Sequence, residues 1–218
     1  MWKNAILDLF FPPRCAICAR VGVHGVCAAC AQTLPRAEKP LREEPPFGRC
    51  AAPLRYEGAV REALLRFKFR GARSAAEGFG QLLAQCAAEE LGGEFDVVTW
   101  VPVSTARRKR RGYDQSYLLA RAAARAWGIE PAELLRKTRD NPPQSSLSGA
   151  AERRGNVAGV YAAADLARIE NARILLVDDI VTTGATLGEC VRVLKDARSQ
   201  SVVCACVASA TEAAHKER

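Results

Sequence analysis

The sequence lacks a long apolar segment and two common nucleotide-binding signatures. None of its apolar runs approaches the about 20 residues that cross a bilayer, so we expect no transmembrane helix. Its N-terminus, MWKNAILDLFFPPRC, contains neither the cationic start nor the small-residue cleavage site of a signal peptide. Neither G-x-x-x-x-G-K-[ST] nor G-x-G-x-x-G occurs, which argues against a P-loop and a Rossmann dinucleotide site. With neither a membrane span nor a signal peptide expected, we expect a soluble, cytoplasmic protein.

Aromatic residues are scarce, at 6% of the chain, so a platform that stacks many nucleic-acid bases is not expected. The hydrophobic fraction of 49% and the charged fraction of 26% are typical of a globular protein. The formal net charge of +8 favours anionic partners, which include nucleic acids, nucleotides and phosphorylated metabolites. Many basic proteins bind no nucleic acid, so the charge alone does not choose among these partners.

The chain has nine cysteines, an odd number that cannot all pair as disulfides. Two C-x-x-C pairs supply four thiolates, the ligand set of a closed tetrahedral zinc site: Cys15, Cys18, Cys27 and Cys30. We predict that residues 1–34 form a small zinc-binding module whose folding depends on one structural zinc. The alternative is four ordinary buried thiols. The remaining cysteines lie among apolar neighbours, as small core side chains do: Cys50, Cys86, Cys190, Cys204 and Cys206.

The rest of the chain is predicted to be one α/β domain at 51–211, joined to the cysteine module by a linker at 35–50 that is rich in proline and charge. Asp114 is the expected N-cap of one helix, and another helix is weakened by two glycines. Strands alternating with helices indicate βαβ units and hence a parallel sheet flanked by helices. We expect strands at 50–58, 96–103, 156–163, 172–179 and 201–209, and helices at 59–70, 74–91, 114–128 and 185–197.

The apolar strand ILLV ends at two adjacent acids, Asp178 and Asp179, and a loop of hydroxyl residues follows. In an open α/β sheet, ligands bind beyond the carboxyl ends of the strands, where these acids are expected. The acids cannot hold a phosphate, but they accept hydrogen bonds from vicinal hydroxyls. The backbone N–H groups and hydroxyls of the loop suit a phosphate, so a ribose 5-phosphate group satisfies both halves. The loop residues are Thr182, Thr183, Gly184, Ala185 and Thr186.

Three alternatives compete with this interpretation of the acid pair. In a phosphoacceptor receiver domain the acids lie on the first strand, whereas this pair lies near the end of the chain. A Walker B strand would be accompanied by the P-loop motif that the sequence lacks. A purely structural pair of acids at a strand end stays open.

The segment ILLVDDIVTTGAT, from Ile174 to Thr186, resembles the phosphoribosyl pyrophosphate (PRPP) motif of type I phosphoribosyltransferases. The resemblance implies a type I phosphoribosyltransferase-like fold. It also implies that Asp178 and Asp179 contact the ribose hydroxyls of PRPP, that the following loop holds the 5-phosphate, and that magnesium accompanies the ligand. It does not identify a reaction.

Three further segments resemble blocks of the ComF family of competence-associated, phosphoribosyltransferase-like proteins, in the same order. They are YEGAVREALLRFKFRG (56–71), VPVSTARRKRRGYDQSYLLA (101–120) and QSSLSGAAERRGNVAGVY (144–161). With the N-terminal cysteine module, the resemblance covers nearly the whole chain. It implies a zinc ribbon in front of a PRPP-binding domain, a role in DNA uptake and natural transformation, and partners in the competence machinery. ComF-like proteins often carry further cysteine pairs, which this chain lacks, so one zinc is expected.

Five adjacent cations follow the strand at 96–103. The resemblance favours two residues of the RGYDQ core, Arg111 and Gln115, as PRPP contacts, because an arginine suits a pyrophosphate. The other cations are candidates for single-stranded DNA binding through its phosphates: Arg107, Arg108, Lys109 and Arg110. The alternative is a solvated basic loop.

The segment at 136–156 lies where type I phosphoribosyltransferases carry a mobile loop, and a lid is expected there. Two functions stay open. One is an enzyme that transfers ribose 5-phosphate from PRPP to an unidentified nucleobase or amine acceptor. The other is a DNA-uptake factor that binds PRPP or a nucleotide together with single-stranded DNA. No residue stands out as a general base, so no catalytic residue is assigned. The family pattern in this segment comprises Gln144, Leu147, Arg154 and Asn156.

Overall fold

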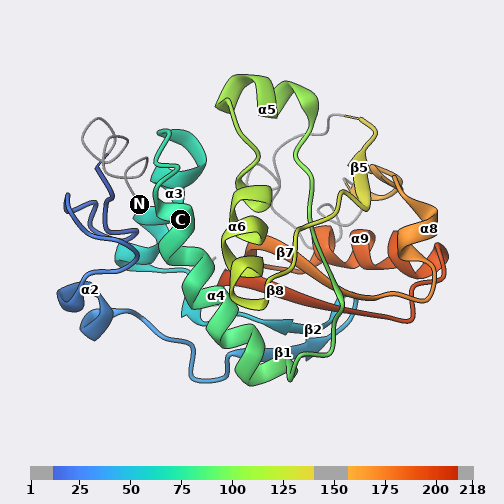
Figure 1. The fold of residues 1–218 in the computed structure, drawn as a ribbon, viewed down its shortest axis with the longest axis horizontal. Helices are drawn as coiled ribbons and strands as arrows, with labels where there is room; N and C mark the ends of the chain where they lie inside the picture. The colour runs from blue at the N-terminus through green and yellow to red at the C-terminus, as the bar shows by residue number, and fades with distance from the viewer. Residues whose placement is uncertain (1–11, 140–156, 211–218) are drawn as a thin grey trace.

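The computed structural model describes residues 12–139 and 157–210. Its central sheet has the strand order β1-β2-β8-β7-β4, with β3 also paired to β8 (Figure 1). All neighbouring strands of this sheet run parallel except β1 and β2, which are antiparallel. The strands are β1 (Leu41–Glu44), β2 (Gly48–Ala51), β3 (Leu54–Arg55), β4 (Val97–Trp100), β7 (Arg173–Val181) and β8 (Ser201–Ser209). The expectation of a mainly parallel α/β sheet is confirmed.

Helices cover both faces of the sheet, so β7 is buried on each side. Leu175 and Val177 enter a core with α3, α4 and α6, whereas Ile174 and Leu176 enter a second core with α9. This explains why β7 is a continuous apolar run rather than an alternating one. The helices are α2 (Ala28–Thr33), α3 (Gly58–Phe69), α4 (Ala75–Leu91), α5 (Thr105–Arg111), α6 (Gln115–Ala124), the 3₁₀ helix η1 (Arg125–Trp127), α8 (Leu166–Ile169) and α9 (Ala185–Asp196).

Several elements differ from the expectations. The residues expected to be a linker, 35–50, contain β1 and most of β2, which extend the main sheet. The segment at 156–163 contributes β6 (Tyr161–Ala163), which pairs with β5 (Leu135–Lys137) in a separate two-stranded sheet rather than in the main one. The basic run forms helix α5 instead of a loop, because Ser104 caps its start and Gly112, in the left-handed conformation, ends it.

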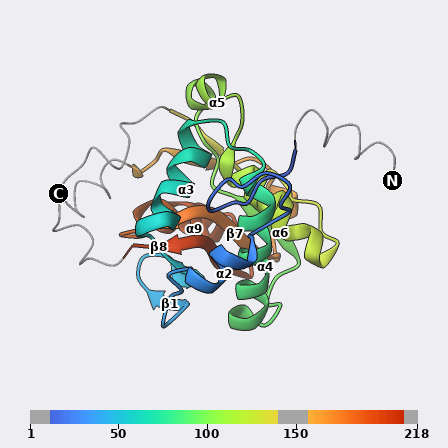
Figure 2. The same cartoon turned by 90° about the vertical axis from the view of Figure 1, so that its left-hand side faces the viewer.

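The N-terminal cysteine module packs on the main domain and shares its core. Cys15, Ala16 and Ile17 are buried in the same cluster as Leu64 and Phe79, which belong to α3 and α4. Figure 2 shows this dark blue segment crossing beside the two helices. Close approach requires one of the two glycines of α4: a Cβ on Gly78 would lie 2.7 Å from the carbonyl oxygen of Gly25. The glycine that weakens the helix in isolation therefore makes room for the module.

The five cysteines outside the module are buried, as expected: Cys50, Cys86, Cys190, Cys204 and Cys206. Burial raises the thiol pKa well above its ordinary value in Cys190, Cys204 and Cys206, so these thiols stay protonated. Among the described residues, no helix has the length and apolar character needed to cross a membrane.

Candidate functional site

The two acids lie on β7 beyond the point where its neighbour β4 ends, since Trp100, the last residue of β4, pairs with Val177. Asp178 Oδ1 accepts hydrogen bonds from Ser116 Oγ and from the Asp179 backbone N–H, each at 2.9 Å. Asp179 Oδ1 lies 2.9 Å from Lys68 Nζ. Asp179 Oδ2 is buried and has no hydrogen-bond partner. The acid pair thus keeps one unsatisfied acceptor, which a ligand hydroxyl would satisfy.

Burial sets the protonation of these groups. It raises the pKa of Asp178 to about 7, with a further contribution from the negative charge of Asp179. Burial alone would lower the pKa of Lys68, but the carboxylate of Asp179 outweighs it and the net shift is upward. Lys68 is therefore a cation at neutral pH, while Asp178 gains its full acceptor capacity only as the pH rises through about 7.

The hydroxyl loop connects β7 to the N-terminus of α9. Gly184 has a φ of 70° and is the N-cap of the helix. Thr182, Thr183 and Thr186 are half-buried. The loop leads directly into the first turn of this 12-residue helix. The free N–H groups of that turn and the positive end of the helix dipole therefore adjoin the loop. The acids lie near the end of β7 and the loop follows that strand directly, so a site for hydroxyls and a site for a phosphate adjoin along the chain.

The tip of the β1–β2 hairpin packs against this loop. A Cβ on Gly184 would lie 2.1 Å from Cδ1 of Phe47, and one on Gly188 would lie 2.2 Å from Cγ of Pro46. Phe47 is buried at this contact. From the same hairpin, Arg42 donates to the carbonyl oxygen of Thr182 at 3.3 Å and to Ser209 Oγ at 2.9 Å. The residues expected to be a linker therefore support the candidate phosphate loop.

Arg111 and Gln115 are brought together at the junction of α5 and α6. Arg111 Nη1 donates to Gln115 Oε1 at 2.7 Å, and the guanidinium lies over the ring of Phe69, 4.9 Å from its centroid. Its Nε is buried without a partner. Burial lowers the pKa of Arg111, opposed by the charge of Asp179. Asp114, as expected, caps α6 by accepting from the Tyr117 N–H at 3.1 Å.

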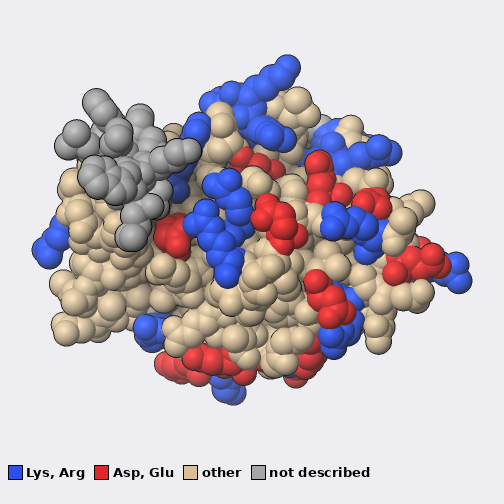
Figure 3. Space-filling view, viewed as in Figure 1, with Lys and Arg blue, Asp and Glu red and all other residues tan. Residues whose placement is uncertain are grey.

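Three of the other four cations of α5 are exposed to solvent. Arg108, Lys109 and Arg110 are exposed, and Arg107 is half-buried. Basic side chains gather at the top of the molecule in Figure 3, where Figure 1 places α5. The basic run therefore divides into two half-buried residues, Arg107 and Arg111, and an exposed basic face formed by Arg108, Lys109 and Arg110.

Sequence reasoning missed Lys68, Ser116 and the hairpin contacts of Arg42 and Phe47. Lys68 and Ser116 lie inside the segments that resemble ComF blocks, which was the available signal. The hairpin offered none, since Arg42 and Thr182 are 140 residues apart. The lid segment and its four pattern residues, Gln144, Leu147, Arg154 and Asn156, fall outside the described residues.

The four module cysteines form a site that fits zinc. Their sulfur atoms all lie within 4.8 Å of one another, which suits four ligands of one tetrahedral ion: Cys15, Cys18, Cys27 and Cys30. The Cys27 N–H donates to Cys15 Sγ at 3.3 Å. Burial raises the pKa of Cys15, but such backbone N–H donors bring it down to about 6, which favours the thiolate. Within residues 12–139 and 157–210, no other group of three or more His, Cys, Asp or Glu side chains lies close enough together to ligate one ion.

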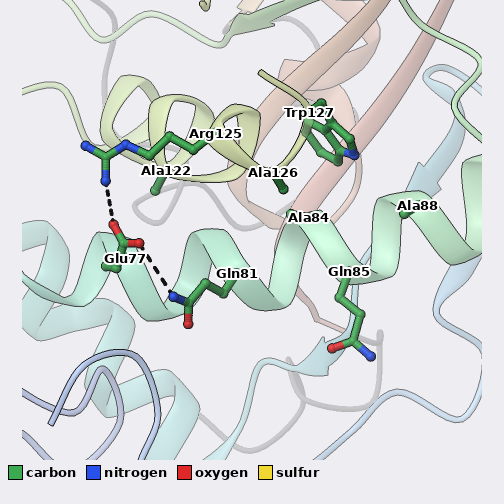
Figure 4. A pocket seen from close by; sticks show the side chains of 9 residues that line it. All are labelled: Glu77, Gln81, Ala84, Gln85, Ala88, Ala122, Arg125, Ala126 and Trp127. Atoms are coloured by element: carbon green, nitrogen blue, oxygen red, sulfur yellow. Dashed lines mark hydrogen bonds and ion pairs between the residues drawn. The ribbon is translucent and has the colours of Figure 1, made fainter. Parts of the chain in front are cut away.

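A separate groove of about 580 Å³ lies between α4 and the α6–η1 segment (Figure 4). Alanines line much of it, and Glu77 pairs with Arg125 at 2.9 Å across one end. It shares no residue with the acid pair or the hydroxyl loop. The groove is therefore distinct from the candidate site.

Comparison with known proteins gives two family matches in order along the chain. A double zinc ribbon domain matches residues 6–64, and a phosphoribosyl transferase domain matches residues 114–218. The competence protein ComFC of Bacillus subtilis is 28% identical over 174 residues, covering 79% of this chain and 68% of that protein. The DNA utilization protein YhgH of Salmonella typhimurium is 26% identical over 205 residues, covering 88% and 89%.

These two domain matches and the similarity to ComFC and YhgH support a ComF-family protein. The chain has the expected type I phosphoribosyltransferase-like fold, with a four-cysteine zinc ribbon in front of a sheet flanked by helices. Among solved structures, the allosteric regulatory enzyme of purine biosynthesis aligns with 64% of this chain and 29% of its own at 25% identity, with a TM-score of 0.44. The protein TT1426 from Thermus thermophilus aligns with 63% of this chain and 84% of its own at 20% identity, with a TM-score of 0.38.

Proposed function

We propose that this ComF protein binds PRPP with its magnesium ion at the carboxyl end of β7. The observation that carries the proposal is the buried, partnerless Oδ2 of Asp179 beside a loop that opens α9. The ribose hydroxyls would donate to Asp178 and Asp179, and the 5-phosphate would accept from the 182–186 loop. The ribose hydroxyls and the 5-phosphate are thereby matched by residues of one continuous segment.

The pyrophosphate would meet Arg111 of α5. Arg111 is within electrostatic reach of Asp179, and its partnerless Nε matches a phosphate oxygen as acceptor. Magnesium, when bound with PRPP, supplies charge neutralisation at the pyrophosphate. If the ribose is transferred to an acceptor, this chain contributes by orienting the ribose and stabilising the leaving pyrophosphate.

Calorimetric titration with PRPP and magnesium tests the proposal. We expect saturable binding by the unaltered chain, and a loss of at least about 10-fold in affinity in Asp178→Asn with Asp179→Asn, since each charged hydrogen bond contributes about 1.5–3 kcal/mol. Pyrophosphate alone should bind the double variant at least as tightly as the unaltered chain, because its proposed partner is Arg111 and the variant removes negative charge nearby. Equal PRPP affinity in both forms, or no binding by the unaltered chain, would show that the ligand assignment is wrong.

A second candidate function is binding of single-stranded DNA by the exposed basic face of α5. Two observations favour it: Arg108, Lys109 and Arg110 are exposed side by side, and relatives carry the names competence protein and DNA utilization protein. Phosphate neutralisation by such residues releases counterions and makes binding steeply dependent on salt. In the proposed arrangement, the DNA backbone runs over α5 while PRPP occupies the sheet edge below it.

Neutralising all three, Arg108→Gln, Lys109→Gln and Arg110→Gln, should weaken binding of an oligothymidine at low salt. The slope of log affinity against log salt should fall by about 2, because each phosphate contact contributes about 0.7 on a single strand. The matched control neutralises three exposed cations elsewhere, Arg20→Gln, Lys39→Gln and Arg136→Gln. If the control lowers the slope equally, the binding is a general effect of net charge and α5 is not the site.

A further inference from the structure

Lys68 is a half-buried cation that contacts the acid pair although it lies outside the ILLVDDIVTTGAT motif. It lies in the last turn of α3, and its Nζ is 2.9 Å from Asp179 Oδ1. Its side chain is 20% exposed, against 6% for that of Asp179, so the pair is largely removed from water. With little water between them the attraction is strong, but each charge also loses hydration, so removing one partner leaves the other charge poorly compensated.

Contacts on both sides hold the end of α3 in place. The hydroxyl of Tyr113 donates to the carbonyl of Phe67, and Phe67 packs edge-on against Phe79 at 6.0 Å. One residue earlier, the guanidinium of Arg66 donates to the carbonyl of Ile17 within the first cysteine pair. The backbone that carries Lys68 is thus fixed before any ligand arrives, which lowers the entropy cost of positioning its ammonium.

A purely structural ion pair would satisfy both carboxylate oxygens, and this one does not. Lys68 engages Oδ1 of Asp179, whereas Oδ2 is buried without a partner, as is Nε of Arg111 nearby. Buried polar atoms without partners are rare, and two of opposite polarity on residues within electrostatic reach of each other point to a ligand that offers both a hydroxyl and an anionic oxygen.

We propose that Lys68 is a positioning residue of the ribose site, whose ammonium fixes the Asp179 carboxylate so that Oδ2 is available to a ribose hydroxyl. This inference rests on the proposed PRPP binding. It assigns a role to a residue outside the PRPP motif, and it makes α3 part of the ligand site.

The same cation also acts on Asp178. The groups that face Asp178 are the charged Asp179 and Lys68, the Ser116 hydroxyl, and four neutral groups with raised pKa values: Tyr161, Cys190, Cys204 and Cys206. Burial and Asp179 raise the pKa of Asp178, and Lys68 lowers it. Removing the Lys68 charge therefore raises that pKa further, so Asp178 needs a higher pH to ionise.

The test compares PRPP affinity in the presence of magnesium, from pH 6 to 9, in the unaltered chain, Lys68→Met and Lys68→Arg. For Lys68→Met we expect at least about 10-fold weaker binding at pH 7, equivalent to about 1.4 kcal/mol, with a deficit that shrinks at pH 9. Lys68→Arg keeps the charge and should restore most of the affinity and the original pH midpoint. The matched control is Lys195→Met, which alters a surface lysine on α9. It should change neither the PRPP affinity nor the pH midpoint.

The outcomes separate the two proposals. If the unaltered chain binds PRPP and Lys68→Met binds it with the same affinity and pH midpoint, the role of Lys68 is wrong while PRPP binding stands. An arginine variant as weak as the methionine variant would also overturn the role, because it retains the charge. If the unaltered chain does not bind PRPP, the proposed function itself fails. Should Lys68→Met not fold, Lys68→Gln carries the same expectation and is measured in its place.

Discussion

Replacing Gly184 with alanine is expected to abolish measurable PRPP binding and to destabilise the protein. The new Cβ would lie 2.1 Å from the ring of Phe47, far inside van der Waals contact, and the φ of 70° is unfavourable for alanine. The left-handed conformation costs about 1–2 kcal/mol and overpacking about 1–3 kcal/mol, so we expect a loss of about 3 kcal/mol in the free energy of unfolding. Relief of the clash would displace the N–H groups that open α9, and PRPP affinity should fall by at least about 100-fold.

Gly93→Ala is the matched control, because Gly93 has the same φ of 70° and no atom within 4 Å of the added Cβ. It should lose about 1 kcal/mol of stability and keep its PRPP affinity. Adding Phe47→Ala to Gly184→Ala should recover part of the lost stability, which a double-mutant cycle in thermal or urea unfolding would measure. Strictly additive effects would show that the hairpin tip does not press on the loop.

Removing zinc should have an equally large effect on stability, although the cysteine module is small. The replacement Cys18→Ser alters an exposed thiol, so it removes a metal ligand without opening a buried cavity. Structural zinc contributes about 10 kcal/mol or more to the folding of isolated zinc peptides. Loss of the ion would release Cys15, Ala16 and Ile17 from the core that they share with α3 and α4.

We expect loss of zinc to lower the free energy of unfolding of the whole domain by about 4 kcal/mol. For a chain of this size, Tm should then fall by about 8–16 °C. The measurement pairs zinc content by mass spectrometry with Tm, before and after chelation. The unaltered chain should hold one zinc, and His24→Ala, at an exposed position between the cysteine pairs, should keep it. A Cys18→Ser chain with full zinc content and an unchanged Tm would contradict the zinc assignment.

Patterns that act over short stretches predicted helices α3, α4, α6 and α9 and strands β4, β7 and β8. The run ILLV, buried on both faces, identifies β7, and Asp114 caps α6 as its position predicts. The paired cysteine spacing predicts the cluster, since two C-x-x-C turns place four sulfurs together with little help from the rest of the chain. These features could be predicted because their causes lie within a few residues of each other.

The hairpin of β1 and β2 could not be predicted, because its composition is that of a linker and its stability comes from distant partners. Its strand β2 pairs with β8, and its tip packs Pro46 and Phe47 onto two glycines of the α9 segment. Lys68 was hidden for a related reason: a lysine at the end of an amphipathic helix is ordinarily a solvated residue, and only the packing of α3 against the sheet turns it toward Asp179. Tertiary contacts that complete a site leave little trace in local periodicity.

A structure of the chain with PRPP and magnesium tests the central claim most directly. We predict that the ribose hydroxyls lie within hydrogen-bond distance of Asp178 and of Oδ2 of Asp179. The 5-phosphate should contact the backbone N–H groups of residues 182–186, and the pyrophosphate should lie beside Arg111. A ligand bound elsewhere, or one whose phosphate leaves the 182–186 loop empty, would contradict the account.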